Sequence, residues 1–246
     1  MLQIEHLTVS IEGKVILRDS IKKGEIACLM GPNGIGKSTI CKVLMGDPHY
    51  KVEAGSIFYK GEDLVSLDVV ERSHKGIYLV SQNPISIEGV TNAEMLRAAL
   101  ESKTGEKSNF FEFNKKAKAI CEKLDIPLEF IHRGVNEGMS GGEKKKNELL
   151  HLYLLEPDLI LLDELDSGLD IDSLKTLSES LSQYKTKEKS ILIITHHISI
   201  LEYLHPDTVH ILKNGRIINS GDYNLAKKIE ADGFSAYEVC EEETYE

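Results

Sequence analysis

The residues best suited to do chemistry begin with a glycine-rich segment near the N-terminus. Residues 31–38 are Gly-Pro-Asn-Gly-Ile-Gly-Lys-Ser, which matches the pattern G-x-x-x-x-G-K-[ST]. Glycines let successive backbone N–H groups point inward around phosphate oxygens, and the positive end of the following helix faces the same anion. Lys37 can reach the β- and γ-phosphates, and the Ser38 hydroxyl can ligate Mg²⁺. The segment predicts a nucleoside triphosphate site. A ligand-free turn is the disfavoured alternative.

A pair of carboxylates closes the apolar run at 159–162. Asp163 and Glu164 are therefore expected at the carboxyl edge of a buried strand, where open α/β sheets bind ligands. Asp163 is suited to hold Mg²⁺ through water, and Glu164 can polarise an attacking water as a general base. An acidic pair that merely caps a helix is the alternative, and the phosphate loop disfavours it.

Three further segments supply polar groups that could join this site. His196 follows the last buried strand and is the candidate for a γ-phosphate contact, with His197 as the second choice. Gln82 follows a short apolar run, where a glutamine can touch Mg²⁺ and the attacking water; a plain surface glutamine is the alternative. Residues 140–143, Ser-Gly-Gly-Glu, precede a helix whose N-terminus suits an anion.

These residues need a scaffold of alternating strands and helices. Continuous apolar runs predict buried strands at 26–30, 159–162 and 191–194, and helical spacing follows the glycine-rich segment at 38–45. The part from 84 to 155 is mostly helical in pattern, with helices expected at 92–100, 114–124 and 142–155. Asn214-Gly215 predicts a hairpin between strands at 209–212 and 216–218. The pattern is typical of α/β proteins with a mainly parallel sheet.

Composition excludes several classes of function. The 246 residues carry a formal net charge of −11, which argues against a nucleic-acid binder and against docking by charge on an anionic membrane. No apolar run approaches the roughly 18 residues of a membrane span, and the N-terminus has no signal-peptide pattern. The four cysteines lie far apart, which disfavours disulfides and a zinc ribbon. We expect a soluble, cytoplasmic protein without membrane insertion.

Taken in order, the segments resemble the motifs of the ATP-binding-cassette (ABC) ATPase family over nearly the whole chain. Residues 31–38 match Walker A, Gln82 the Q-loop, 139–143 the signature motif, 159–164 Walker B, 167–170 the D-loop and His196 the switch histidine. The resemblance implies one ABC ATPase domain over 1–246. Its RecA-like, mainly parallel core with an antiparallel β part would comprise 1–83 and 156–246, and an inserted helical subdomain would comprise 84–155.

The resemblance also implies roles for individual residues, with ATP and Mg²⁺ as the ligands. The catalytic residues are Glu164, His196 and Gln82, and the Mg²⁺ contacts are Ser38, Gln82 and Asp163, the last through water. The nucleotide contacts are Gly31, Asn33, Gly34, Ile35, Gly36, Lys37, Ser38, Thr39 and Asp170, with Ser140 and Gly142 acting across a head-to-tail dimer. That dimer would form transiently on ATP binding, and a lone monomer should hydrolyse ATP poorly.

A narrower resemblance involves residues 136–148 and 163–172, which look like the SUF iron–sulfur assembly ATPases. It implies a SufB-like scaffold partner, with or without a SufD-like one. A transporter cassette would more often carry Gln at Glu143 and Ala at Gly168. The transporter cassette remains the alternative, and a regulatory module that does not hydrolyse ATP is a third reading. The intact Lys37, Asp163, Glu164 and His196 weigh against that third reading.

Three details qualify the resemblance. Ile11 occupies the position where many family members stack an aromatic residue on adenine, so selectivity for the base is left open. The stretch from Leu17 to Lys23 is about three residues shorter than usual for the family, which would shorten a peripheral strand. Residues 144–146 are three lysines, expected to be a solvated helix face. The sharper hypothesis is that one of these lysines, with Lys145 as the first candidate, pairs with Glu164 and holds the monomer inactive.

Overall fold

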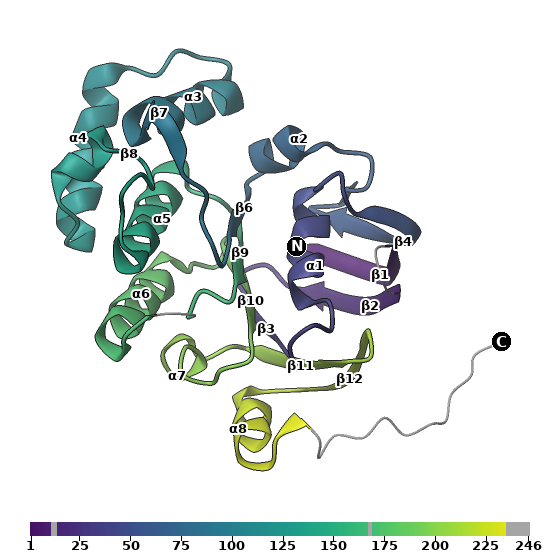
Figure 1. Ribbon diagram of the computed structural model, residues 1–246. Coiled ribbons are helices and arrows are strands. Elements are labelled where there is room, and N and C mark those ends of the chain that lie inside the picture. Colours follow the sequence, from purple (N-terminus) through teal and green to yellow (C-terminus); the bar gives the residue numbers. More distant parts are fainter. Residues whose placement is uncertain (11–13, 167–168, 235–246) are drawn as a thin grey trace.

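The computed structural model describes residues 1–10, 14–166 and 169–234, and its central feature is a six-stranded sheet (Figure 1). The strands are, in spatial order, β12 (Arg216–Gly221), β11 (Thr208–Lys213), β3 (Ile26–Met30), β10 (Ser190–Thr195), β9 (Leu159–Asp163) and β6 (Ile77–Val80). Neighbours run parallel except for the antiparallel β11–β12 hairpin. The mainly parallel sheet and the predicted hairpin at residues 214–215 are both confirmed.

Alternate residues of the central strands enter two different hydrophobic cores. In β3, Ile26, Cys28 and Met30 pack on one face, together with apolar residues of the helices after residue 92. Ala27 and Leu29 point the other way and pack with the N-terminal strands. Because successive side chains of a strand face opposite sides, a sheet covered on both faces is built from continuous apolar runs. This explains why such runs in the sequence predicted these strands.

A second, antiparallel sheet covers one of the two faces. Its order is β2 (Lys14–Ile21), β1 (Leu2–Ser10), β4 (Lys51–Tyr59) and β5 (Glu62–Asp63). Helix α1 (Lys37–Met45) shares a core with both sheets, and it lies between them in Figure 1. The predicted antiparallel part is thereby confirmed. β2 pairs with β1 along its whole length, from Leu2 opposite Ile21 at one end to Ser10 opposite Lys14 at the other.

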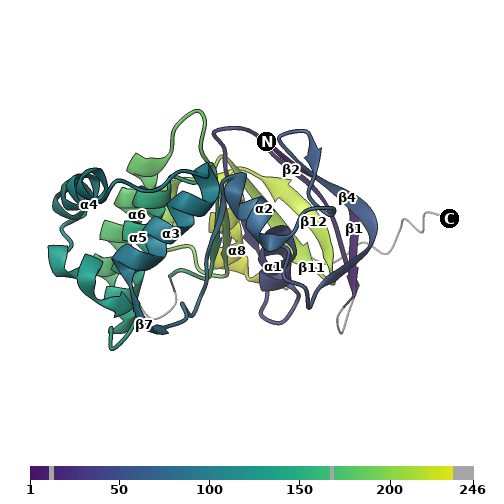
Figure 2. The same cartoon turned by 90° about the horizontal axis from the view of Figure 1, so that it is seen from above.

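The opposite face carries the helices of the middle segment (Figure 2). They are α3 (Asn92–Thr104), α4 (Phe110–Leu124), a 3₁₀ helix (Leu128–His132) and α5 (Gly141–Leu155). Helix α4 starts four residues before its predicted start, because Asn109 accepts hydrogen bonds from the N–H groups of Phe111 and Glu112. The segment also contains a short ribbon that the sequence analysis missed, β7 (Ile87–Thr91) paired with β8 (Gly134–Val135).

Buried amides join these middle elements to one another. Asn147 on α5 donates hydrogen bonds to the amide oxygens of Asn92 (3.1 Å) and Asn136 (3.0 Å). His151 Nε2 lies 2.6 Å from the same oxygen of Asn92. We call Asn92, Asn136, Asn147 and His151 the amide cluster; all four side chains are almost fully buried. Asn136 also donates to the carbonyl of Ile85, so the cluster reaches the segment that follows Gln82.

The remaining helices complete the described part of the chain. They are α2 (Val69–His74), α6 (Ile171–Tyr184), α7 (Leu201–Leu204) and α8 (Tyr223–Asp232). Buried Arg72 of α2 donates to the carbonyls of Val43 and Leu44 in the last turn of α1, and so helps to cap the C-terminal end of that helix. Among residues 1–10, 14–166 and 169–234, no helix combines the length and apolar character that a bilayer crossing requires.

Candidate functional site: a phosphate loop facing a carboxylate

The glycine-rich segment forms a loop between β3 and α1, as its sequence predicts. Gly34 and Gly36 both adopt left-handed backbone conformations, with φ of 80° and 97°, which glycine adopts without a steric penalty. Helix α1 begins at Lys37, and no side chain caps its first N–H groups. Asn33 and Gly34 are exposed at the tip of the loop. The uncapped N–H groups and the helix dipole suit an anion, so this loop fits a phosphate group.

Gly31 is required for a different reason, because neighbouring atoms approach its Cα too closely to leave room for a side chain. A Cβ atom at this position would lie 2.4 Å from the carbonyl oxygen of Leu212 and 2.5 Å from the Ile35 side chain. Leu212 belongs to β11, the neighbour of β3 in the sheet. The start of the phosphate loop therefore packs directly on the C-terminal hairpin.

Lys37 lies inside the loop with its charged end turned back toward the backbone. Its Nζ donates to the carbonyl oxygens of Gly31 and Pro32, both at 2.8 Å, and the side chain is only 4% exposed. Burial lowers the pKa of Lys37, while the charges of Glu164 and Asp163 oppose that shift. Hydrogen bonds from an ammonium group to phosphate oxygens are stronger than those to neutral carbonyls, so a bound phosphate would replace these two carbonyls as acceptors.

The hydroxyl and carboxylate assigned to magnesium meet as predicted. Ser38 Oγ donates to Asp163 Oδ1 at 2.8 Å, which links the start of α1 to the end of β9. Burial is the main cause that raises the pKa of Asp163, and the hydrogen bond from Ser38 opposes it. A divalent cation at this carboxylate would offset that cost. Hydroxyl and carboxylate oxygens are ligands that Mg²⁺ accepts alongside water and phosphate, so the pair fits the metal.

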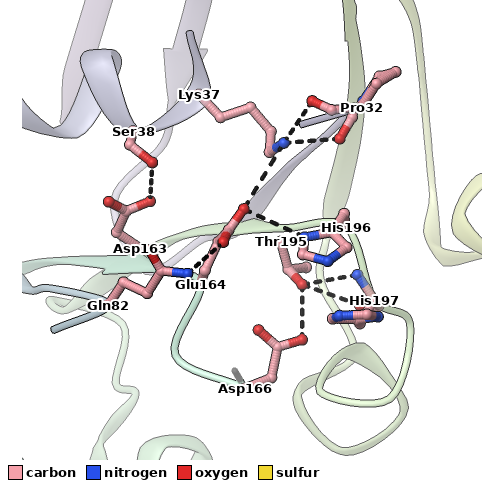
Figure 3. Close-up of polar contacts among 11 residues, drawn as sticks. Pro32, Lys37, Ser38, Gln82, Asp163, Glu164, Asp166, Thr195, His196 and His197 are labelled. Carbon is pink, nitrogen blue, oxygen red and sulfur yellow. Dashed lines mark hydrogen bonds and ion pairs between the residues drawn. The ribbon is translucent and has the colours of Figure 1, made fainter. Parts of the chain in front are cut away.

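Glu164 is the centre of the polar contacts drawn in Figure 3. Its Oε2 accepts a hydrogen bond from Gln82 Nε2 at 2.9 Å, and its Oε1 lies 3.3 Å from His196 Nδ1 and 3.9 Å from Lys37 Nζ. The backbone at Glu164 is left-handed, with φ of 48°, and its N–H donates to the carbonyl of Ile194. The structure thus brings Gln82, Glu164, His196 and Lys37 together.

The hypothesis that Lys145 pairs with Glu164 is wrong. Lys145 Nζ donates instead to the backbone carbonyl of Gln82 at 3.2 Å. Within the described residues, the Glu164 carboxylate contacts Gln82, His196 and Lys37. Lys145 is also not part of a solvated face, because it is 6% exposed. The geometry explains the error: α5 approaches the site beside the backbone of the segment at Gln82, so this carbonyl meets the ammonium group first.

Other predicted residues lie at helix starts away from this group. Ser140 caps α5 in a reciprocal arrangement with Glu143, and Asp170 caps α6 by accepting from the N–H of Ser173. Within the described ranges, none of the hydrogen bonds joins Ser140 or Asp170 to Glu164. A Cβ added at Gly142 would meet no atom within 4 Å, so the start of α5 is open to a ligand.

Some sequence-predicted positions lie outside the described residues: Ile11, Ser167 and Gly168, and Cys240 in the C-terminal segment. The other three cysteines are buried free thiols. Sequence reasoning missed two buried residues beside the site, Thr195 and Asp166, although both belong to the segments already singled out. Their only sequence signal was position, one residue before His196 and two after Glu164.

Together these contacts provide the parts of a phosphoryl-transfer site. The loop and Lys37 can hold the terminal phosphates, and Mg²⁺ held by Ser38 and Asp163 would neutralise charge on their oxygens. Glu164 could accept a proton from water, because its carboxylate lies 3.9 Å from the ammonium group of Lys37, which would contact the γ-phosphate. Gln82 and His196 hold that carboxylate from two sides.

Comparisons with known proteins show the family of this chain. The family model described as ABC transporter matches residues 17–167. A probable ABC transporter ATP-binding protein of Streptococcus pyogenes serotype M18 is 44% identical over 240 residues, covering 96% of this chain and 94% of that protein. The probable ATP-dependent transporter ycf16 of Trieres chinensis is 44% identical over 245 residues, covering 95% and 96%.

The fold also has a clear structural relative. A nucleotide-free ATP-binding cassette from an ABC transporter superposes with a TM-score of 0.77 at 26% identity, covering 99% of each chain. The family match spans the phosphate loop, Gln82, the α5 start and Asp163 with Glu164. On this evidence the chain belongs to the ABC transporter family as an ATP-binding cassette, and it is an ABC-type ATPase.

Proposed function

We propose that this chain hydrolyses ATP with Glu164 as the general base, Gln82 and His196 as its positioning partners, and Mg²⁺ on Ser38 and Asp163. The observation that carries the proposal is the position of the Glu164 carboxylate, which three side chains surround at the edge of the sheet above the phosphate loop. The catalytic core would comprise 1–83 and 156–246, and the helical subdomain 84–155.

The ATP site is completed, in this proposal, by a second copy of the chain. Ser140, Gly142 and Asp170 lie at helix starts whose polar groups are exposed or partly exposed. In a head-to-tail dimer the Ser140 end of α5 would face the γ-phosphate held by the partner's loop, where its helix dipole favours negative charge. ATP would then join the two cassettes, and hydrolysis would release them.

For the partner, we propose a SufB-like scaffold, with or without a SufD-like one, so that the chain serves as a SufC-type subunit in the cytoplasm. The supporting feature is Glu143, the residue that distinguishes this signature segment. Glu143 accepts from Arg133 at 2.8 Å as well as capping α5, and these bonds lower its pKa to about 2. A glutamine could still cap the helix but would lose the ion pair with Arg133.

A transport motor is the second candidate, and the names of the relatives favour it. Both relatives described above carry the word transporter in their names. In that case the same ATPase cycle would act on a membrane-embedded partner. The two candidates share the chemistry and differ only in what the cassette moves.

Anaerobic affinity purification of the tagged chain from its native cells separates the two candidates. Soluble scaffold subunits carrying iron and sulfide are the expected co-purifying proteins. A multi-span membrane protein in their place would overturn the scaffold proposal and leave the ATPase chemistry intact.

The role of Glu164 is tested by Glu164→Gln. The amide keeps the shape of the side chain but cannot accept a proton at neutral pH, so we expect kcat to fall at least about 100-fold while ATP binding is retained. The bound ATP should trap a dimer, visible by light scattering.

The matched control is Glu179→Gln, which makes the same change at an exposed position of α6. It should leave turnover and oligomeric state unchanged. Turnover by Glu164→Gln within a few-fold of the parent protein would remove Glu164 from the role of base.

A further inference from the structure

A buried carboxylate that takes no part in the proposed chemistry lies two residues after Glu164. Asp166 is 8% exposed, and its Oδ2 accepts a hydrogen bond from Thr195 Oγ1 at 2.9 Å. Its other oxygen, Oδ1, is buried and has no hydrogen-bond partner in the described part of the chain. A buried acceptor left this way costs free energy. The hydrogen bond to Thr195 is the feature that could justify keeping a carboxylate here.

The Thr195 hydroxyl connects this carboxylate to the backbone of the histidine turn. Thr195 is fully buried, and its Oγ1 accepts from the N–H of His197 at 2.9 Å. A hydroxyl has one proton, and an ionised carboxylate can only accept. The Thr195 hydroxyl lies 2.9 Å from Asp166 Oδ2 and 3.3 Å from the carbonyl oxygen of His197, so the nearer acceptor, Asp166, takes the proton, which leaves a lone pair for the N–H of His197. Hydrogen bonds arranged in such a chain polarise and strengthen one another.

His196 is the residue held inside this turn. It lies between Thr195 and His197 in the sequence, which are joined by the hydrogen bond from the N–H of His197 to Thr195 Oγ1. Its own Nδ1 faces Glu164 Oε1 at 3.3 Å. Figure 3 shows Asp166 on one side of Thr195 and the histidine pair on the other. A backbone bond from Glu164 N–H to the carbonyl of Ile194 is a second link between the same two loops. The imidazole is therefore fixed relative to the loop that carries the base.

We propose that Asp166 and Thr195 are positioning residues that act as one unit and orient His196 toward Glu164 and the γ-phosphate. The proposal rests on the proposed role of His196. It assigns Asp166 no contact with ATP, water or Mg²⁺: its effect passes through the hydroxyl of Thr195 and the backbone of the turn. Breaking the link should therefore impair the chemical step and leave nucleotide affinity almost unchanged.

Thr195→Val is the first test, because valine keeps the shape of threonine and lacks the hydroxyl. We expect kcat of the full chain to fall about 10-fold or more, with the dissociation constant for ATP changed less than about 2-fold. Thr195→Ser, which keeps the hydroxyl, should restore most of kcat. The matched control is Ser190→Ala, which removes a fully buried hydroxyl at the other end of the same strand. It should lower the melting temperature but leave kcat unchanged.

A double-substitution cycle tests whether the two residues act together. Asp166→Ala and Thr195→Val should each lower kcat by a similar factor, and the double variant should lose no more than either one. A loss equal to the product of the two single losses would overturn the proposal. So would a loss in Thr195→Val no greater than that in Ser190→Ala. The melting temperature and the ATP affinity are measured for every variant. A loss of kcat that is caused by unfolding is therefore recognised and kept apart from a loss in the folded protein.

His196→Ala separates this proposal from the proposed function. Unchanged kcat in His196→Ala would show that His196 has no catalytic role, and both the role and its positioning would fall. If His196→Ala loses activity while Thr195→Val and Asp166→Ala keep theirs, the role of His196 stands and only the positioning proposal fails.

Discussion

Two polar groups in this molecule are built in opposite ways. One is the amide cluster, and the other is the group of Lys37, Asp163 and Glu164 at the end of the parallel strands, which we call the catalytic edge after its proposed role. At the catalytic edge, Lys37, Asp163 and Glu164 carry charge, and the Glu164 contacts range from 2.9 to 3.9 Å. In the amide cluster no side chain is an acid or a lysine, and His151 lies 2.6 Å from Asn92. The edge keeps charges whose partners a ligand can replace. The cluster satisfies most of its groups internally and stabilises the position of α5.

This contrast makes the phosphate loop the place of the largest expected effect. Lys37→Ala should weaken ATP binding about 100-fold or more, because in our proposal the ammonium is the loop's charged contact with phosphate. The free energy of unfolding should change little, since removing Lys37 also removes the cost of burying its charge. Equilibrium titration with a fluorescent ATP analogue and thermal melts measure the two quantities.

The control for this variant is Lys42→Ala, in the last turn of the same helix. It should bind the analogue as the parent protein does. Lys37→Ala could instead keep its affinity for ATP within about 3-fold and lose free energy of unfolding. Lys37 would then stabilise the fold as the amide cluster does, and the contrast between the two groups would fail.

The amide cluster should show the reverse pattern. Asn147→Ala removes two hydrogen bonds and leaves the buried amide oxygen of Asn136 without its donor, while that of Asn92 keeps His151; we expect a cost of about 3 kcal/mol in the free energy of unfolding. ATP affinity should stay within about 2-fold. Urea denaturation and the same ATP titration check this, with Asn224→Ala at an exposed site of α8 as the control. A loss of ATP affinity without a loss of stability would contradict it.

The smallest effect concerns the pH dependence of stability. Burial lowers the pKa of His151 from 6.5 to about 4. In this interval the unfolded chain binds a proton that the folded chain does not, so stability falls as pH falls from about 6.5 toward 4. This histidine should contribute a loss of about 2 kcal/mol between pH 7 and pH 5.

His151→Gln should remove that part of the pH dependence, since glutamine can still donate toward Asn92 but does not titrate. Urea denaturation at pH 7 and pH 5 gives the comparison. The matched control is His132→Gln, which makes the same substitution at an exposed histidine. It should keep the pH dependence of the parent protein. If the free energy of unfolding of His151→Gln changed with pH as much as that of the parent protein, burial in the cluster would not prevent His151 from binding a proton.

The same two groups differ in how far the sequence predicted them. The loop at 31–38 and the pair Asp163-Glu164 were predictable because each motif is local and follows an apolar run that indicates a buried strand. Gln82 and His196 were placed correctly beside Glu164 because parallel strands end at a common edge. Their catalytic roles stay predictions.

The amide cluster was not predicted, because its members come from three separate segments (α3, the loop after β8, and α5) and carry no local pattern. Asparagine is common at helix starts and in loops, so Asn92 and Asn136 gave no sign of burial. The predicted contact of Lys145 with Glu164 was wrong for a related reason. The partner of Lys145 is a backbone carbonyl, which a pattern of side-chain types does not indicate. Local motifs indicate chemistry, whereas contacts between distant segments depend on how the helices pack.

The position of β3 in the sheet has a consequence for protein synthesis. This strand leads into the phosphate loop, yet both of its neighbours, β10 and β11, come from residues 190–213. The loop itself rests on Leu212 through Gly31. A nascent chain that has emerged only as far as α6 therefore exposes β3 with two unpaired edges and has no finished loop. The ability to bind ATP should therefore arise late in translation, after β10 and β11 have left the ribosome and paired with β3.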